Sequence, residues 1–273
     1  MAAAAGRGRE RAGPHLTESD HRGSGTLGSR DGFPRDAQQD GKNRPPHDIS
    51  LFLMAYNEEH IIEFAVLECL KTLSRIARNY EVIIVDDGSS DRTRAISLEL
   101  AQAHEHVRLI AHEKNLGVGC AQKTGYYNSK YDLITYVPGD YQVRMDAIEA
   151  MLPHIDDCDI VVGRRVNRQD YQARVRAAEF YNLTLRTMFG LKVRDIDSIK
   201  IIRKRVLDDI KIESSSANVD VELMVRAHRR GYRIKEVDVP HYASVGGQQT
   251  GVSPRVMQRQ LRELIPFWLK NVK

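Results

Sequence analysis

From Asp48 onward the chain alternates short apolar runs with longer stretches of helical periodicity, and this alternation is the feature that most limits its fold. Ile49 to Ala55 is a strand-like run, and a helical pattern follows it as far as Leu73. The same strand-then-helix unit recurs until Pro240, which ends the last strand-like run. Such alternation is typical of α/β proteins. We therefore predict an α/β fold with a mainly parallel sheet and helices on both of its faces.

The expected elements can be given as residue ranges. We predict strands at 49–55, 81–85, 107–111, 133–137, 159–162, 196–202 and 233–239. We predict helices at 61–73, 93–103, 120–128, 145–152, 172–189, 218–230 and 254–270.

The composition divides the chain into three parts. Residues 1–47 are rich in Ala, Gly, Arg, Asp, Ser and Pro, so we expect a disordered N-terminal tail there. Residues 48–254 carry the alternating pattern and form the predicted α/β domain. Residues 255–273 read as an amphipathic C-terminal helix that contains Trp268. This helix either lies in a membrane interface or packs on the core, and both alternatives stay open.

Charge and hydropathy exclude several classes of protein. The net charge of +4 is too small to indicate nucleic-acid binding without a localised basic face. No apolar run approaches the roughly 20 residues of a membrane helix, and the N-terminus shows no secretory signal. Cys69, Cys120 and Cys158 lie far apart and read as buried thiols. We expect a cytoplasmic protein, with a peripheral contact at the inner face of the membrane as an open alternative.

Acidic residues follow three of the predicted strands. Glu58 comes after the first strand, Asp86 and Asp87 after the second, and Asp140 after the fourth. The carboxyl ends of parallel strands share one edge of a sheet, where ligands of open α/β sheets bind. We therefore expect one crevice that holds a cation or a polar ligand such as a nucleotide.

The stretch from Pro138 to Gln142 allows two interpretations. Pro, Gly and Asp are common turn residues, so the segment could serve only to reverse the chain. Because Asp140 stands at the end of a strand, it is also a candidate for holding a metal or a substrate.

Several motifs in this order and spacing resemble family 2 glycosyltransferases, which have the nucleotide-sugar-binding, Rossmann-like fold called GT-A. Within that family the chain is most similar to the branch that makes polyprenol-phosphate sugars, typified by dolichol-phosphate mannose synthases. The similarity covers about residues 49–254. The motifs are Ala55-Tyr56-Asn57-Glu58-Glu59, Val85-Asp86-Asp87-Gly88-Ser89-Ser90-Asp91-Arg92-Thr93, Asn115-Leu116-Gly117, Gly139-Asp140-Tyr141-Gln142, Gly163-Arg164-Arg165 and Val221-Glu222-Leu223.

The resemblance implies a set of roles. It implies nucleotide contacts by Tyr56, Glu58, Asp86, Asp87 and Gly139, with Asp87 accepting a hydrogen bond from the base. It implies that Asp140 and Gln142 bind a divalent Mg²⁺ or Mn²⁺ ion, and that the donor is a UDP- or GDP-linked sugar. It implies acceptor contacts by Arg165, Arg174, Glu222 and Ser253.

The chain departs from the family pattern at three places. The first aspartate of the Asp-x-Asp-x-Gln metal motif is Pro138, so we expect weak, substrate-assisted metal binding. A serine that follows the second acceptor arginine is Ala178. The basic loop of the acceptor site is replaced by residues 243–254. These changes leave the donor half intact and leave the acceptor open between a polyprenyl phosphate and a hydroxyl group.

The resemblance implies an inverting transfer in which charge on the departing diphosphate is stabilised. A phosphate acceptor is already largely ionised at neutral pH and needs no base. A hydroxyl acceptor does need one, and Asp220 is the first candidate, with Asp197 second. A noncatalytic protein that binds nucleotide sugars, with a degraded metal site, is the alternative that Pro138 suggests.

Overall fold

The computed structural model describes residues 45–166, 172–242, 262, 264 and 266–269, without side-chain positions for 172–174 and 177. The strands are β1 (Asp48–Ala55), β2 (Asn79–Asp86), β3 (Val107–Ala111), β4 (Leu133–Pro138), β5 (Ile160–Val166), β6 (Lys200–Arg203) and β7 (Ile234–Pro240). The helices are α1 (Ile62–Ile76), α2 (Thr93–Ala103), α3 (Val118–Asn128), α4 (Met145–Met151), the 3₁₀ helix η1 (Leu152–Asp157), α5 (Gln172–Phe189), α6 (Lys204–Asp209) and α7 (Val219–Arg229).

The strands form one seven-stranded sheet in the order β3-β2-β1-β4-β6-β5-β7. Strands β3, β2, β1 and β4 pair in parallel, as do β5 and β7. Only β6 runs against its neighbours, β4 and β5, among the strands that the structure describes. The prediction of a mainly parallel α/β sheet is confirmed.

One predicted strand is shorter than its sequence pattern suggests. Apolar residues at 196, 199, 201 and 202 indicated a strand over 196–202, but β6 begins only at Lys200. Residues 195–198 form a turn at the edge of the sheet instead. Side chains from α5, β5 and β7 hold this turn in place, and a local sequence pattern cannot anticipate such contacts.

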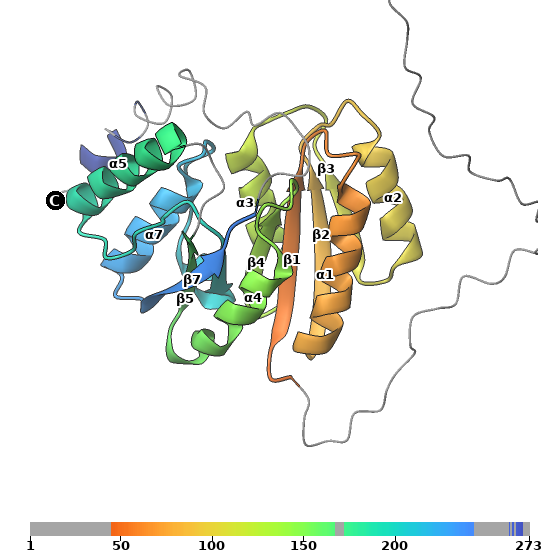
Figure 1. The fold of residues 1–273 in the computed structure, drawn as a ribbon, viewed down its shortest axis with the longest axis horizontal. Coiled ribbons are helices and arrows are strands. Elements are labelled where there is room, and N and C mark those ends of the chain that lie inside the picture. The colour runs from red at the N-terminus through yellow and green to blue at the C-terminus, as the bar shows by residue number, and fades with distance from the viewer. Residues whose placement is uncertain (1–44, 167–171, 243–261, 263, 265, 270–273) are drawn as a thin grey trace, which may run out of the picture. The chain divides into compact units, whose positions relative to one another are not determined.

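Helices cover the sheet in the way that right-handed crossovers require. Helix α1 packs beside α2 and α4, whereas α3 packs on β1 and β2 and lies against α7 (Figure 1). The central strands are therefore buried along most of their length, as is typical of parallel sheets. Every residue of β4 from Leu133 to Val137 is buried, and the strand becomes accessible only at Pro138.

Three aromatic rings fill the core where α3 crosses the sheet. The ring of Phe52 stacks on Tyr136 at 5.4 Å and meets the edge of Tyr126 at 5.2 Å. Gly125 of α3 lies directly over Phe52, since a Cβ atom at this position would be 2.2 Å from Cδ2 of that ring. The helix approaches the sheet this closely because residue 125 has no side chain.

The described part of the C-terminal segment packs on the domain. Residues 262, 264 and 266–269 are helical, with Leu264 buried and with Phe267 and Trp268 against the core. Its described apolar side chains thus mostly face the protein, although Leu269 is exposed. No helix that the structure describes has the length and hydropathy needed to cross a membrane. The predicted tail lies almost wholly in residues 1–44, outside the described residues.

Candidate active site

The turns that follow β1 and β2 are joined by hydrogen bonds at the carboxyl edge of the sheet. The Asn57 amide donates to Ser89 Oγ over 3.0 Å, and the Ser90 amide donates to Asn57 Oδ1 over 2.8 Å. The Glu58 amide donates to the hydroxyl oxygen of Thr93 over 2.8 Å. Asn57 has a positive φ of 57°, which asparagine tolerates better than most residues do. These bonds fix the first turn of the site.

The carboxylates of Glu58 and Asp140 interact at this edge. Burial, together with repulsion from Asp140 and Asp91, raises the pKa of Glu58 to about 7. Tyr56, which precedes these acids at the end of β1, keeps 41% of its surface exposed. The expected convergence of Glu58 and Asp140 on one edge is therefore confirmed.

The segment from Pro138 to Gln142 is a turn that presents Asp140. The Gly139 amide donates to the Met54 carbonyl of β1 over 3.0 Å, and a Cβ on Gly139 would be 2.5 Å from that oxygen. Tyr141 is buried with a φ of 53°, an unusual conformation for an aromatic residue. The Gln142 amide donates to Asp140 Oδ1 over 3.1 Å. The segment is therefore a turn that places an acid at the sheet edge, and a role of Asp140 in holding a metal or a substrate stays a prediction.

The oxygen donors at this edge suit a divalent ion that is shared with a substrate. No group of three or more His, Cys, Asp or Glu side chains among the described residues could hold a metal ion. Asp140 and Gln142 nevertheless offer a carboxylate and an amide oxygen, and Glu58 is a second carboxylate close by. Mg²⁺ often takes only one or two carboxylates together with substrate phosphates. The residues present fit such a shared ion.

Asp86 is fully buried at the end of β2 and organises the second turn of the site. Its Oδ1 accepts the Ser89 amide over 3.0 Å, and its Oδ2 accepts Arg94 Nε over 2.7 Å. Arg94 also donates to the His112 carbonyl beyond β3. The carboxylate of Asp86 thus joins the ends of β2 and β3 through Arg94.

Asp87 holds the next loop of the rim. Its Oδ1 lies 2.7 Å from His112 Nδ1 and accepts the Leu116 amide over 3.0 Å. Its Oδ2 accepts the Gly117 amide over 2.8 Å, and the other ring nitrogen of His112 lies 3.0 Å from the hydroxyl of Thr124. A nucleotide base that donates to Asp87 would share these oxygens with the loop.

Arg165 ends β5 and is held by a carboxylate of the chain. Its Nε and Nη2 donate to the two oxygens of Asp195 over 2.8 and 2.7 Å, and its amide donates to Oδ2 over 3.1 Å. This bidentate pair uses Nε and Nη2 of the planar guanidinium, and 18% of the Arg165 side chain stays exposed. Of the other predicted acceptor residues, Arg174 has a side chain outside the described residues, and Ser253 lies outside them altogether.

Glu222 is buried in the first turn of α7 and caps the preceding loop. Its two oxygens accept the amides of Glu213 and Ser214 over 2.9 and 2.7 Å, and Arg226 lies 2.7 Å away. A cavity of about 570 Å³ opens beside it, with Phe267 among its lining residues. By accepting these two amides, the carboxylate of Glu222 holds the loop that lines one side of the cavity.

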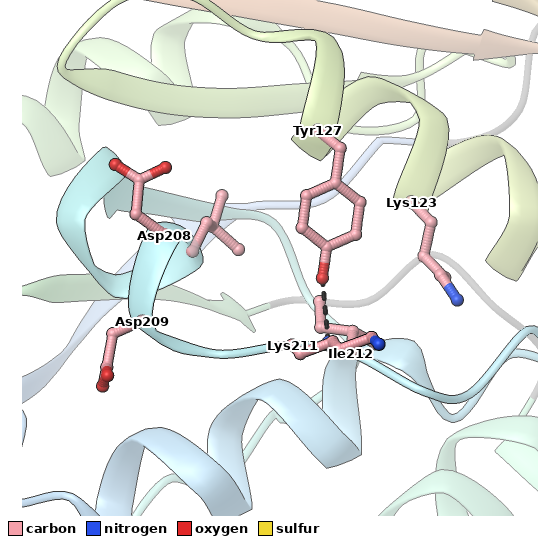
Figure 2. Close-up of a pocket in the computed structure, with 7 residues that line it drawn as sticks. Lys123, Tyr127, Asp208, Asp209, Lys211 and Ile212 are labelled. Atoms are coloured by element: carbon pink, nitrogen blue, oxygen red, sulfur yellow. Dashed lines mark hydrogen bonds between the residues drawn. The ribbon is translucent and has the colours of Figure 1, made fainter.

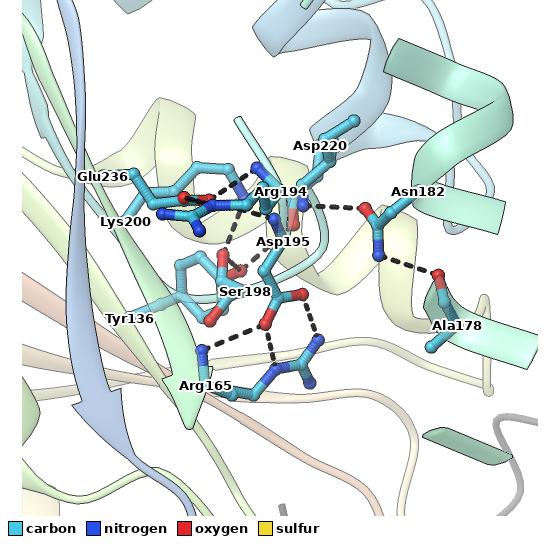
Figure 3. A network of polar contacts seen from close by, with 11 residues as sticks. Tyr136, Arg165, Ala178, Asn182, Arg194, Asp195, Ser198, Lys200, Asp220 and Glu236 are labelled. Carbon is cyan, nitrogen blue, oxygen red and sulfur yellow. Dashed lines mark hydrogen bonds and ion pairs between the residues drawn. The ribbon is translucent and has the colours of Figure 1, made fainter. Parts of the chain in front are cut away.

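Asp220, the first candidate base, lies inside the protein. Its carboxylate accepts Gln122 Nε2 over 2.9 Å and the hydroxyls of Tyr126 and Tyr136 over 3.2 and 3.0 Å. The ammonium of Lys200, which is fully buried, lies 2.9 Å from Asp220 Oδ1 (Figure 3). A general base must reach the proton that it removes. Asp220 is enclosed by donors, whereas the order of the two candidate bases stays a prediction.

Asp197, the second candidate, is exposed in the turn before β6. Desolvation of its carboxyl group by the surrounding protein, together with repulsion from Asp220, nevertheless raises its pKa to about 7. Lys200 and Arg165 act in the opposite direction. An accessible carboxylate that titrates near neutral pH is suited to accept a proton.

The structure adds three residues that the sequence motifs missed: His112, Asp195 and Lys200. Lys200 carried a recognisable signal, because it is a single charged residue in the apolar run Ile199 to Ile202. The roles of His112 and Asp195 depend on partners 25 and 30 residues away, and no local pattern indicated them.

A second cavity lies at the other end of the sheet. It has a volume of about 460 Å³ and is lined by Lys123 and Tyr127 of α3, by the end of α6 and by the segment that follows α6 (Figure 2). The Tyr127 hydroxyl accepts the Ile212 amide over 2.8 Å. Because α3 ends and α6 begins near the amino end of β4, this cavity is remote from the acidic edge.

Comparison with known sequences agrees with the motif pattern. Residues 50–211 match the family model described as Glycosyl transferase family 2. The chain is 26% identical over 195 residues to undecaprenyl-phosphate 4-deoxy-4-formamido-L-arabinose transferases of Photorhabdus laumondii and Proteus mirabilis. Each match covers 71% of this chain and 59% of the relative, so the chain spans less than two thirds of the relatives' length.

Solved structures share the fold at low sequence identity. Glucosyl-3-phosphoglycerate synthase from Mycobacterium tuberculosis, in complex with phosphoglyceric acid, aligns with a TM-score of 0.61 and 18% identity. The match covers 78% of this chain and 77% of that one. The same enzyme with Mn²⁺, UDP and glucosyl-3-phosphoglycerate aligns with a TM-score of 0.59 and 17% identity, over the same shares of the two chains. At this identity the likeness establishes a common fold, the GT-A arrangement.

Proposed function

The chain belongs to glycosyl transferase family 2, and we propose that it moves a sugar from a nucleoside diphosphate sugar to a polyprenyl phosphate. The observation that carries the proposal is the meeting of the Glu58 and Asp140 carboxylates beside the exposed Tyr56 at the carboxyl edge of the sheet. This is the edge at which open α/β sheets bind nucleotides. The names of the curated relatives favour the lipid phosphate as acceptor.

On the donor side, Tyr56 offers an accessible ring for stacking on the base, and Glu58 offers oxygens for the ribose hydroxyls. Asp86 and Asp87 keep the surrounding loops in place, and Asp87 can also accept from the base. Gly139 lets the Asp140 turn lie close against the end of β1, because a Cβ there would be 2.5 Å from the Met54 carbonyl oxygen. We assign the base as uracil or guanine, in keeping with a UDP- or GDP-linked donor.

Asp140 and Gln142 would hold Mg²⁺ or Mn²⁺ together with the donor diphosphate. When bound, the ion supplies positive charge for the departing diphosphate. It would also relieve the repulsion between Asp140 and Glu58, so metal and donor should bind cooperatively. Structures of the mycobacterial synthase hold Mn²⁺ or Mg²⁺ together with UDP, which supports this choice of ion.

On the acceptor side, the outer edge of the Arg165 guanidinium suits a phosphate, with Arg174 and Ser253 as further candidate contacts. An acceptor oxygen attacks the anomeric carbon while the bond to the diphosphate oxygen breaks, which inverts the configuration at that carbon. A lipid acceptor keeps its phosphate at the membrane surface, so we assign the reaction to the cytoplasmic face of a membrane.

A hydroxyl acceptor is the second candidate, and Asp197 is the observation that favours it. A hydroxyl must lose a proton as it attacks, and an exposed carboxylate with a pKa of about 7 can take that proton. A phosphate monoester has at most one proton left to give.

The test is transfer of radiolabelled sugar from a panel of UDP- and GDP-sugars, with Mg²⁺ or Mn²⁺, to undecaprenyl phosphate. Label in the organic phase supports the lipid acceptor, and release of UDP or GDP only on addition of a hydroxyl compound supports the second candidate. Asp140→Ala should abolish turnover. Asp132→Ala, at the exposed amino end of the same strand, should not. Nucleotide-sugar binding without turnover, unchanged in Asp140→Ala, would show a noncatalytic protein.

A further inference from the structure

The interior contains a charged pair that the proposed chemistry does not use. Lys200 is fully buried, and its ammonium donates to the Ser198 carbonyl over 2.7 Å and pairs with Asp220 over 2.9 Å. A buried ion pair is weak evidence for stability, because removing two charges from water offsets much of their attraction. Stability alone therefore does not explain a buried ion pair at this position.

The pair lies where the donor and acceptor halves of the site meet. Tyr136 of β4 contributes its hydroxyl, which lies 3.0 Å from Asp220 Oδ2 and 3.0 Å from the Ser198 carbonyl. The Asp140 turn begins two residues after Tyr136. Asp197 immediately precedes Ser198, whose carbonyl Lys200 binds. One network therefore touches both the strand that presents Asp140 and the turn that presents Asp197 (Figure 3).

The rest of the Asp197 turn is anchored from other elements. The amides of Arg194 and Asp195 donate to Glu236 Oε1 of β7 over 2.6 and 3.1 Å. The Ile196 amide donates to Asn182 of α5 over 3.0 Å. On the C-terminal side of Asp197, Lys200 holds the turn by donating to the Ser198 carbonyl. The turn is held on both flanks of Asp197 while Asp197 itself stays exposed.

We propose that Lys200 is a positioning residue, which with Asp220 holds the 195–198 turn so that Asp197 faces the acceptor. This inference rests on the proposed function. Lys200 does not touch a substrate in this role. It acts through the Ser198 carbonyl, which fixes the backbone, and through its charge, which opposes the charge of Asp220 at Asp197.

The two members of the pair act on Asp197 in opposite senses. A like charge disfavours the ionised carboxylate, so Asp220 raises its pKa, whereas the ammonium of Lys200 lowers it. Removing one partner should therefore shift the titration of Asp197 in the direction opposite to removing the other. The described charged or titratable groups that act on Asp197 are Asp220 from α7, Lys200 from β6, Arg165 from β5, Asp195 from the same turn and Tyr181 from α5.

The decisive experiment is an NMR titration of the Asp197 carboxyl carbon in ¹³C-aspartate-labelled full chain, assigned with Asp197→Asn. The titration midpoint should move to higher pH in Lys200→Met and to lower pH in Asp220→Asn. Lys204→Met is the matched control, since this lysine pairs on the surface with Asp208 over 2.6 Å and should leave the midpoint in place. Midpoints that do not move, or that move in the same direction, would overturn the inference.

The double variant Lys200→Met with Asp220→Asn distinguishes an effect of the pair on the stability of the fold from an effect on the position of Asp197. Neutralising both partners should recover the stability that Lys200→Met alone loses, because no uncompensated charge stays buried. UDP release from UDP-glucose with Mn²⁺ and undecaprenyl phosphate should nevertheless remain lower by roughly tenfold or more in kcat, with little change in donor KM. A double variant with both wild-type stability and wild-type kcat would show a purely structural pair. An inactive wild-type chain would refute the proposed function, whereas the NMR titration would still decide the role of Lys200.

Discussion

The close contact between Gly125 and Phe52 gives a stability prediction whose sign is informative. In a helix, Gly→Ala ordinarily stabilises by about 1 kcal/mol, since alanine has the higher helix propensity. Here the new Cβ would be 2.2, 2.4 and 2.5 Å from three atoms of the Phe52 ring. The ring is itself held by Tyr126 and Tyr136 and is fully buried, so it cannot swing aside.

Relief of this contact needs a movement of roughly 1 Å in a packed core, and overpacking of this kind costs about 1 to 3 kcal/mol. After subtraction of the propensity gain, we expect Gly125→Ala to destabilise the domain by about 0 to 2 kcal/mol, so that the usual gain of about 1 kcal/mol is lost. The free energy of unfolding is measured by urea titration, followed by circular dichroism. A variant more stable than the wild type by the full propensity gain of about 1 kcal/mol would refute the packing argument.

A double-mutant cycle identifies the contact responsible. Phe52→Leu removes part of the ring and leaves space beside Gly125, so Gly125→Ala should be less harmful in that background than in the wild type. We expect a coupling free energy of about 1 kcal/mol between the two sites. Strict additivity would mean that the strain of Gly125→Ala is relieved elsewhere, for instance by a shift of the whole helix.

Further predictions concern buried and half-buried acidic residues and one histidine that contacts them. The pKa of Glu58 is higher in the folded state than in the unfolded state, so ionisation of its carboxyl group destabilises the fold. The wild type should therefore lose stability as pH rises from 4.5 through about 7. Glu58→Gln does not ionise, so its stability relative to the wild type should increase over this range. The gain should reach roughly 1 to 2 kcal/mol in urea titrations at pH 8, discounted for partial exposure, and equal differences at pH 4.5 and 8 would contradict it. His112→Ala should speed amide exchange in the loop that Asp87 holds, measured by mass spectrometry, and unchanged exchange would show that Asp87 suffices alone. Glu81→Gln should cost about 1 to 3 kcal/mol, because this carboxylate is buried and accepts Arg108 Nε over 3.0 Å; a neutral effect on urea unfolding would contradict that.

The elements that build the donor half could be predicted because their signals are local. Alternation of apolar runs and helical periods located β1 to β4, and the acidic residues at their ends located the site. Asp140 was found in this way although Pro138 breaks the family motif. Local signals sufficed because parallel strands joined by helices leave little freedom in where their carboxyl ends meet.

The acceptor half was harder to predict because its contacts are distant in sequence. Asp220 stands at the start of a helix, where an acid is favourable for the helix dipole, and nothing nearby reveals that Lys200 neutralises it. The turn at 195–198 reads as a strand, since its apolar residues fit either state. The cysteines show the same limit: Cys69 and Cys158 are buried as expected, whereas Cys120 is only half-buried where α3 meets the Ser215 carbonyl.

The reversed direction of β6 affects how the site can vary. In a purely parallel sheet, only segments that leave a strand reach the ligand edge. Here the chain also delivers side chains to that edge as it enters a strand, since β6 runs away from the site towards Arg203. The Asp197 turn can therefore be lengthened, or its charged residues replaced, without altering the segments that follow β1, β2 and β4. Under the proposed function, the residues that recognise the donor and those that recognise the acceptor lie in separate stretches of sequence, so one set can change while the other is kept.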